Sequence, residues 1–199
     1  MEKMHVNRIK TQLGYEIDGP LLISPDIISD SRGFFYECWN KRNFDKLIGK
    51  DTIFVQDNHS KSQKGILRGL HYQIPDFAQA KLVRCISGMV FDVAVDIRKS
   101  SPTFKQYVSA ILDDKNKYML WIPEGFAHGF LALSEFAEVQ YKTTDYWSKE
   151  HERVIKWNDP LLGIKWPNDL VYNLNITLSN RDLNAPLLKD LNFEKDFFI

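Results

Sequence analysis

A short segment between residues 65 and 73 combines residue types that bind phosphate and move protons. Arg68 and His71 lie three positions apart in the sequence Gly-Ile-Leu-Arg-Gly-Leu-His-Tyr-Gln, and Lys81 follows ten residues after His71. A guanidinium offers two parallel donors to a phosphate or carboxylate. An imidazole exchanges a proton near neutral pH. Together these residues predict a phosphorylated small molecule that is bound beside a general base.

The spacing of Arg68 and His71 requires an irregular strand if both are to serve one site. Side chains alternate between the two faces of a regular strand, so residues three apart point in opposite directions. Gly69 lies between them, and glycine often marks a β-bulge near a functional site. We therefore expect a bulge at Gly69. Without the two cations, His71 would be interpreted as a strand histidine with a satisfied hydrogen bond.

Other candidate residues have a structural and a functional interpretation. His128 lies in a glycine-rich stretch, residues 123–130, which predicts a turn, and it either caps backbone groups or faces a ligand. Tyr141 shares strand parity with apolar residues and either packs or acts as an acid. Trp147 either packs or stacks on a flat base. Asp182 either begins a helix or takes part in the site.

Several kinds of chemistry are disfavoured by the sequence. The chain has five histidines and no His-x-His pair, so a metal site has little support. It has neither a glycine-rich phosphate loop nor a dinucleotide-binding fingerprint. We therefore expect no metal and no cofactor.

Composition limits the partners and the compartment. Lys+Arg and Asp+Glu both total 26, so the net charge is zero and a nucleic-acid partner is not expected. No apolar run approaches the roughly 20 residues that span a bilayer, and the N-terminus lacks a signal-peptide pattern. The two cysteines, Cys38 and Cys85, form no disulfide or zinc pattern. These features predict one cytoplasmic domain over residues 1–199 without a membrane partner.

The sequence pattern predicts a mainly β protein that would position these side chains. Alternation from Met89 to Ile97 gives one apolar face and one mixed face that carries Asp92. A helix is expected within residues 34–49, stopped by Gly49, and a short helical tail after Ser179. A turn is expected at Ser87-Gly88. Further strands are expected at residues 53–58, 81–86, 107–112, 118–122, 129–133 and 138–144. Many short strands at close spacing indicate a sandwich or barrel.

Seven long stretches of the chain resemble those of a known protein family. They are SRGFFYE, FVQDNHSKS, GILRGLHYQ, KLVRCISGMVFDVAVDIRKSSPTF, LWIPEGFAHGFLALS, YKTTDYWSKEHER and WNDPLLGIKWP, and they extend over about residues 5 to 190. In these stretches the chain closely resembles the dTDP-4-dehydrorhamnose 3,5-epimerase family. The resemblance implies an all-β fold, a cupin-like jelly-roll β-barrel with short N-terminal and C-terminal helical segments. It also implies a homodimer that needs no metal.

The resemblance assigns a role to each matching position. His71 corresponds to the catalytic base, Asp182 to the carboxylate that orients it, Tyr141 to the acid, and Lys81 to the lysine near the ketone oxygen. Positions implied in or beside the nucleotide-sugar site are Arg32, Glu37, Gln56, Asp57, Asn58, Arg68, Lys81, His128, Glu152 and Arg181. Trp147 stands where family members often stack a tyrosine on thymine, and Arg181 where a lysine is common.

The implied reaction converts dTDP-4-dehydro-6-deoxy-D-glucose to dTDP-4-dehydro-L-rhamnose by inverting carbons 3 and 5. Three alternatives differ from it. A relative that inverts one carbon only, or acts on another nucleotide sugar, would share nearly all of these motifs. A catalytically silent sugar-nucleotide-binding barrel would not need the intact His71, Lys81, Tyr141 and Asp182. A metal-dependent cupin oxygenase would need the missing His-x-His pair.

Overall fold

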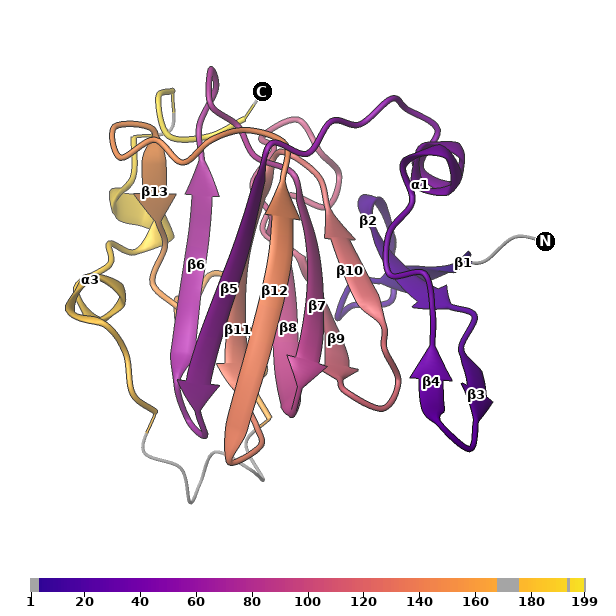
Figure 1. Ribbon diagram of the computed structural model, residues 1–199. Coiled ribbons are helices and arrows are strands. Elements are labelled where there is room, and N and C mark those ends of the chain that lie inside the picture. The colour runs from indigo at the N-terminus through magenta and orange to yellow at the C-terminus, as the bar shows by residue number, and fades with distance from the viewer. Residues whose placement is uncertain (1–3, 168–175, 193, 199) are drawn as a thin grey trace.

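Two antiparallel β-sheets that face each other dominate the computed structural model, which describes residues 4–167, 176–192 and 194–198 (Figure 1). The six-stranded sheet has the order β1 (Met4–Lys10), β2 (Glu16–Pro25), β10 (Met119–Ile122), β7 (Lys81–Ser87), β12 (Phe136–Thr143) and β5 (Gln56–Gln63). The five-stranded sheet has the order β13 (Glu152–Val154), β6 (Leu67–Gln73), β11 (Phe126–Ala132), β8 (Met89–Asp96) and β9 (Tyr107–Asp113).

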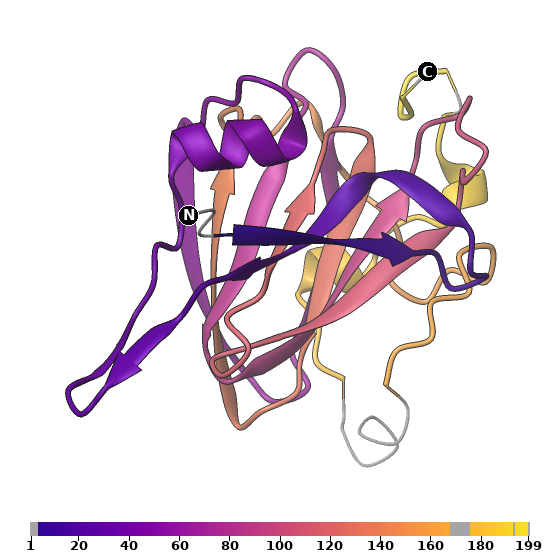
Figure 2. The ribbon, with the colours of Figure 1, turned by 90° about the vertical axis from the view of Figure 1, so that its right-hand side faces the viewer.

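From β5 to β13 the chain crosses between the sheets at every step except β8 to β9. This is the jelly-roll arrangement, and the predicted all-β, cupin-like fold is confirmed, although the two sheets do not close into a continuous barrel. Strands β3 (Ile28–Asp30) and β4 (Gly33–Phe35) form a separate hairpin. Figure 2 shows this hairpin projecting beyond the sheets. The described helical segments are α1 (Lys41–Ile48), α3 (Asn180–Leu183) and the single 3₁₀ turn η1 (Leu188–Asp190).

The main core lies between the sheets because the inward side chains of alternating strands meet there. Its buried residues include Val83, Val90, Ala94, Leu112, Leu120, Phe130 and Val139. Toward β5, β6 and the C-terminal segment this space is lined by polar as well as apolar side chains and is hollow. The apolar core therefore supports one side of a polar cavity.

Strand β8 has the apolar face and the mixed face that the sequence predicted, and both faces are largely buried. Val93 and Val95 point outward, where Ile155, Leu162, Leu188 and other residues of the C-terminal segment cover them. The mixed face points between the sheets, and Asp92 on this face has no solvent exposure. On the outside of the other sheet, α1 packs Phe44 against Trp121 at a ring distance of 5.2 Å.

Several predicted boundaries are corrected by the structure. The helix expected within residues 34–49 covers only Lys41–Ile48, because the Asn40 side chain caps its start by accepting from the Asn43 backbone N–H. Gly49 ends it with φ 72°, as predicted. The strand expected at residues 53–58 begins only at Gln56 and continues to Gln63. The turn at Gly88 is confirmed by its φ of 78°.

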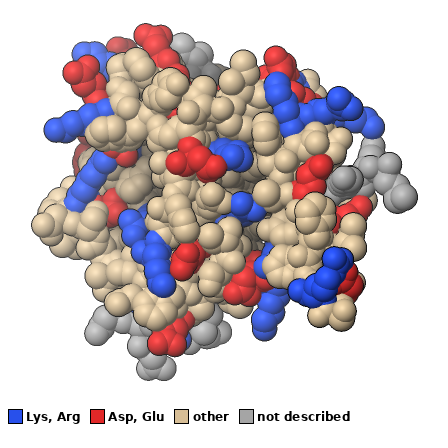
Figure 3. Space-filling view, in the orientation of Figure 1, with Lys and Arg blue, Asp and Glu red and all other residues tan. Residues whose placement is uncertain are grey.

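The strand expected at residues 129–133 begins three residues earlier, at Phe126. All seven of its residues are buried, and Gly129 within the strand packs closely against β6, whereas Gly125, with φ 88°, lies in the turn before the strand. His128 consequently lies within β11 and not in the turn that the sequence predicted. Figure 3 shows basic and acidic side chains interspersed on the face seen in Figure 1. No described helix is long and apolar enough to cross a membrane.

Candidate active site

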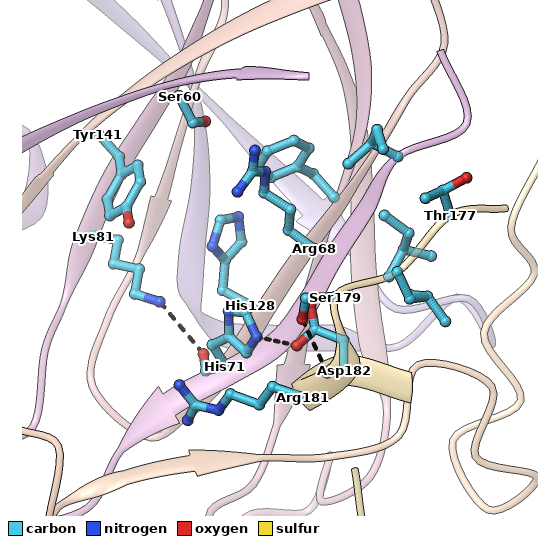
Figure 4. Close-up of a pocket in the computed structure, with 14 residues that line it drawn as sticks. Ser60, Arg68, His71, Lys81, His128, Tyr141, Thr177, Ser179, Arg181 and Asp182 are labelled. Atoms are coloured by element: carbon cyan, nitrogen blue, oxygen red, sulfur yellow. Dashed lines mark hydrogen bonds and ion pairs between the residues drawn. The ribbon is translucent and has the colours of Figure 1, made fainter. Parts of the chain in front are cut away.

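A cavity of about 490 Å³ opens between the two sheets and the C-terminal segment (Figure 4). Side chains from β5, β6, β7, β11 and β12 line it, together with residues next to and within α3. Among the candidates named from the sequence, those that line the cavity are Arg68, His71, Lys81, His128, Tyr141, Arg181 and Asp182. Residues that are remote in the sequence are therefore brought into one space.

A bulge at Gly69 turns Arg68 and His71 toward this cavity. His71 pairs with His128 and Arg68 with Phe130, so β6 takes three steps where β11 takes two. Gly69 has φ 131°, and a Cβ atom there would lie 2.5 Å from the Gly129 Cα atom. Only glycine suits such a conformation and such a close approach. The bulge predicted from the sequence is therefore present.

His71 forms a close pair with Asp182 of α3. His71 Nε2 lies 2.6 Å from Asp182 Oδ1, and the two residues are 111 positions apart in the chain. The Ser179 hydroxyl caps α3 by accepting from the Asp182 backbone N–H at 3.1 Å. Burial alone would raise the pKa of Asp182, but the hydrogen bond and charge of His71, with smaller contributions from Ser179 and the Gly69 backbone, outweigh it and lower that pKa. Asp182 is therefore an anion that fixes one nitrogen of His71.

A second histidine–aspartate pair lies deeper in the same cavity. His128 Nε2 lies 3.0 Å and 3.1 Å from the two carboxylate oxygens of Asp92. The side chains of His128 and Asp92 are 7% and 0% exposed. Burial lowers the pKa of His128, although the Asp92 charge opposes this shift. His128 is therefore a neutral imidazole, and its Nε2–H donates to Asp92.

Lys81 and Tyr141 come from adjacent strands of the six-stranded sheet, opposite His71. Lys81 Nζ donates to the backbone carbonyl of His71 at 3.3 Å. Burial lowers the pKa of Lys81 to about 8, while the charges of Glu152 and Asp92 act in the other direction. Burial also raises the pKa of Tyr141, so its phenol keeps its proton at neutral pH. Lys81 supplies a cation and Tyr141 an acidic hydrogen to one space.

A group of polar residues is linked by hydrogen bonds to Arg181, which lines the cavity. Arg181 Nη1 pairs with Glu152 Oε2, and the Trp147 indole N–H donates to the same oxygen at 2.8 Å. The Trp147 backbone N–H donates to Gln56 Oε1 at 3.1 Å. The Gln56 amide in turn donates to Asn58 Oδ1 at 2.9 Å. Arg68 Nε donates to Ser62 Oγ at 3.0 Å, which aligns its guanidinium along the cavity wall.

Three candidates from the sequence lie away from the cavity. Arg32 lies at the turn of the projecting hairpin and pairs with Asp30 at 2.6 Å. Glu37 follows that hairpin and accepts from the Asn43 side-chain amide at 2.9 Å. Asp57 pairs with Lys142 at 2.9 Å. The described residues contain no group of three or more His, Cys, Asp or Glu side chains placed to bind a metal ion.

Comparison with known proteins identifies the family. A family model described as dTDP-4-dehydrorhamnose 3,5-epimerase matches residues 14–190. The chain belongs to this family. The dTDP-4-dehydrorhamnose 3,5-epimerase of Shigella flexneri is 51% identical over 194 residues, which cover 98% of this chain and 100% of the relative.

Solved structures of epimerases have the same fold. The dTDP-6-deoxy-D-glucose-3,5-epimerase of Legionella pneumophila Philadelphia 1, in complex with dTDP-4-keto-L-rhamnose, has a TM-score of 0.85, 49% identity and 96% coverage of both chains. ChmJ, a 3′-monoepimerase from Streptomyces bikiniensis in complex with dTDP-quinovose, has a TM-score of 0.80 and 34% identity, covering 87% of this chain and 85% of that chain. The chain is therefore similar in fold both to a 3,5-epimerase and to a 3′-monoepimerase.

Asp92 is one of the described residues at this epimerase-family site that were not predicted from the sequence; Ser60 and Ser179, which line the cavity, are others. Asp92 lies on the mixed face of β8, beside β11, which carries His128. A charged side chain flanked by Phe91 and Val93 in a mostly apolar strand was the available signal. A carboxylate is seldom fully buried without a specific partner. That partner became visible only when β11 was found to extend back through His128.

Proposed function

We propose that this chain inverts carbons 3 and 5 of dTDP-4-dehydro-6-deoxy-D-glucose and so forms dTDP-4-dehydro-L-rhamnose for dTDP-L-rhamnose biosynthesis. The observation that carries the proposal is that a proton acceptor and a proton donor come from opposite sheets. His71 belongs to β6 and Tyr141 to β12, and both line one cavity. Inverting a carbon requires proton removal on one face of the sugar and proton return on the other.

His71 acts as the general base. The ketone at carbon 4 acidifies the protons on carbons 3 and 5, so no redox cofactor is needed. Asp182 accepts a hydrogen bond at His71 Nε2, which leaves Nδ1 to take the substrate proton. The electron pair of the broken C–H bond moves into an enolate. The Asp182 carboxylate stabilises the imidazolium that results, in the way an aspartate does beside a catalytic histidine.

Lys81 and Tyr141 complete each inversion. Negative charge grows on the ketone oxygen as the enolate forms, and the Lys81 ammonium stabilises it. This interaction is stronger in a buried site than in water. Tyr141 then donates its phenolic proton to the opposite face of the same carbon. His71 releases its proton and Tyr141 regains one from solvent before the second carbon reacts, so the overall reaction is redox neutral.

The remaining polar residues bind the nucleotide part. Arg68 and Arg181 pair with the diphosphate, because guanidinium groups match phosphate oxygens. Trp147 stacks on the thymine, with Gln56, Asn58 and Glu152 around it. His128 contacts the sugar from deeper in the cavity. Binding energy gained at these places, remote from carbons 3 and 5, helps to align the reacting groups.

We also propose that the enzyme is a homodimer. The projecting hairpin exposes 66% of Ile28, 58% of Phe34 and 67% of Phe35, an apolar surface that a second copy would cover. Arg32 and Glu37, on and after this hairpin, would then reach the partner's nucleotide site. The two cysteines are free thiols, which supports a cytoplasmic location.

Analysis of the product tests the proposed reaction. Chelator-treated enzyme is incubated with dTDP-4-dehydro-6-deoxy-D-glucose, and the proton couplings at carbons 3 and 5 of the product are measured by NMR. An L-sugar inverted at both carbons is the expected product. A sugar inverted at one carbon only would indicate an enzyme like the 3′-monoepimerase. Substrate that remains unchanged, with or without added divalent metal, would contradict the proposal.

A further inference from the structure

Glu152 connects two parts of the site that are separate in the sequence. Its Oε2 atom accepts the Trp147 indole N–H at 2.8 Å and also pairs with Arg181 Nη1. The Glu152 side chain is only 12% exposed, whereas that of Arg181 is 47% exposed. One shielded carboxylate oxygen therefore joins the segment after β12 to α3.

On one side of this carboxylate, the Trp147 ring is held at two points. Its backbone N–H donates to Gln56 Oε1 at 3.1 Å, and its indole N–H donates to Glu152. The residue is nevertheless 55% exposed, so the ring face is accessible to a ligand. A phenylalanine would offer the same flat surface but no N–H donor. The indole nitrogen thus gives the ring an orientation that packing does not supply.

On the other side, Arg181 precedes Asp182 in α3, a helix of four residues. So short a helix has little stability of its own. It is anchored by the Ser179 cap, by the Asp182–His71 pair and by the Arg181–Glu152 pair. The contact with Glu152 therefore helps to place the Asp182 carboxylate beside His71.

We propose that Glu152 is a positioning residue that couples the ring of Trp147 to the His71–Asp182 pair. The inference builds on the proposed function, in which thymine stacks on Trp147. A thymine base that stacks on the Trp147 ring stabilises the orientation in which the indole N–H donates to Glu152. The same carboxylate orients Arg181 and, through α3, Asp182. Binding at the nucleotide end thereby contributes to the rate of proton abstraction and not to affinity alone.

The kinetic test compares Trp147→Phe, Glu152→Gln and the double variant with the wild type. Tyr146→Phe is the matched control, because Tyr146 is the adjacent aromatic residue and is 60% exposed. Turnover is measured on the plateau of each pH profile, since Glu152 also influences the pKa of Lys81. Loss of a hydrogen bond to a shielded charge is expected to lower kcat about tenfold in Glu152→Gln and about threefold in Trp147→Phe.

Coupling is revealed by the double variant. Because both substitutions interrupt one connection, kcat of the double variant should lie within about twofold of the Glu152→Gln value. Tyr146→Phe should resemble the wild type. The proposal is overturned if Trp147→Phe raises KM while kcat stays unchanged, or if the two losses in kcat simply multiply. Either result would make Trp147 a stacking surface alone.

A second measurement does not depend on turnover. The amides of Asp182, Leu183 and Asn184 are hydrogen-bonded within α3 and its cap, so hydrogen exchange reports on how firmly α3 is seated. Exchange of these amides in the free enzyme should accelerate about tenfold in Glu152→Gln and remain unchanged in Tyr146→Phe. Unchanged hydrogen exchange in Glu152→Gln would contradict the proposed connection between Glu152 and α3. If the wild type failed to act on the sugar nucleotide, the proposed function would fail while this exchange result would still decide the coupling.

Discussion

The cavity contains two histidine–aspartate pairs that differ in how they are built. His71 and Asp182 join a strand to a four-residue helix across 111 positions of the chain. His128 and Asp92 lie on two neighbouring strands of one sheet. The His71 side chain is 29% exposed, whereas that of His128 is 7% exposed. The first pair opens onto the cavity, whereas in the second only the His128 ring reaches the cavity wall and the Asp92 side chain is fully buried behind it.

This difference separates a group that must change charge from one that must not. A catalytic base becomes a cation during each turnover, and a partly open site with a nearby carboxylate tolerates that charge. Charging His128 would place an additional cation close to Lys81, and burial and Lys81 both lower the pKa of His128. In the proposed mechanism, the same residue types therefore serve proton transfer at His71 and fixed positioning at His128.

Replacing the two histidines in turn gives the largest expected effect. His71→Asn should lower the rate of product formation about 10³-fold, because a general base contributes roughly 10²–10⁴-fold. His128→Asn should lower it only about tenfold, since the variant keeps the base. The rates are measured with saturating substrate, and circular dichroism confirms that both variants fold. A larger loss in His128→Asn than in His71→Asn would reverse the assignment.

Replacing the two aspartates separates activity from stability. Asp182→Asn should lower kcat about 10²-fold with a small change in Tm, because α3 lies at the edge of the fold and can shift. Asp92→Asn should cost about 1–3 kcal/mol of unfolding free energy, because its strand cannot move away from the buried imidazole. Thermal unfolding and kcat are measured on both proteins. Equal losses of kcat and of stability in the two variants would contradict the distinction between a catalytic pair at His71 and a structural pair at His128.

Tyr141→Phe tests the role of the tyrosine that faces both histidines from the other sheet. The variant lacks the proton donor but keeps His71, so product formation should fall about tenfold or more while deuterium uptake from solvent falls less. The ratio of uptake to product formation is the measured quantity. If this ratio stays at the wild-type value, Tyr141 does not return the proton.

The pH dependence of kcat/KM gives the smallest expected effect. Lys81 must be protonated to stabilise the enolate, and burial lowers its pKa to about 8, so kcat/KM should fall as the pH rises through about 8. The Glu152 charge raises this pKa, and Glu152→Gln should therefore move the alkaline limb to lower pH. Asp92→Asn should move it in the same direction. A limb that remains in place in both variants would exclude Lys81 as its cause.

Local sequence patterns predicted the part of the site that is formed by residues close together in the chain. Gly69 between Arg68 and His71 predicted the bulge, because only a break in alternation brings both side chains to one face. The mixed face of β8 was also visible, but a charge on a strand has no assigned partner until the neighbouring strand is placed. Asp92 was missed for that reason, since His128 was expected in a turn.

Long-range placement could not be derived from local patterns. Nothing near Ser179 in the sequence indicates that α3 folds back onto β6, and only the family resemblance connected Asp182 with His71. Strand β5 begins later than expected: Ile53 and Val55, although apolar and β-branched, precede its first paired residue, Gln56, and only the Val55 backbone N–H bonds to the end of β12. Propensity favoured a strand there, and the register with β12 determined where pairing begins.

The most direct test of the central claim is proton NMR of the wild type and of His71→Asn with dTDP-4-dehydro-6-deoxy-D-glucose in deuterium oxide. One base serving both carbons predicts that the wild type incorporates deuterium at carbon 3 and at carbon 5, and that His71→Asn incorporates it at neither. Continued incorporation at either carbon in His71→Asn, with the protein folded, would show that another group removes that proton and would contradict the account.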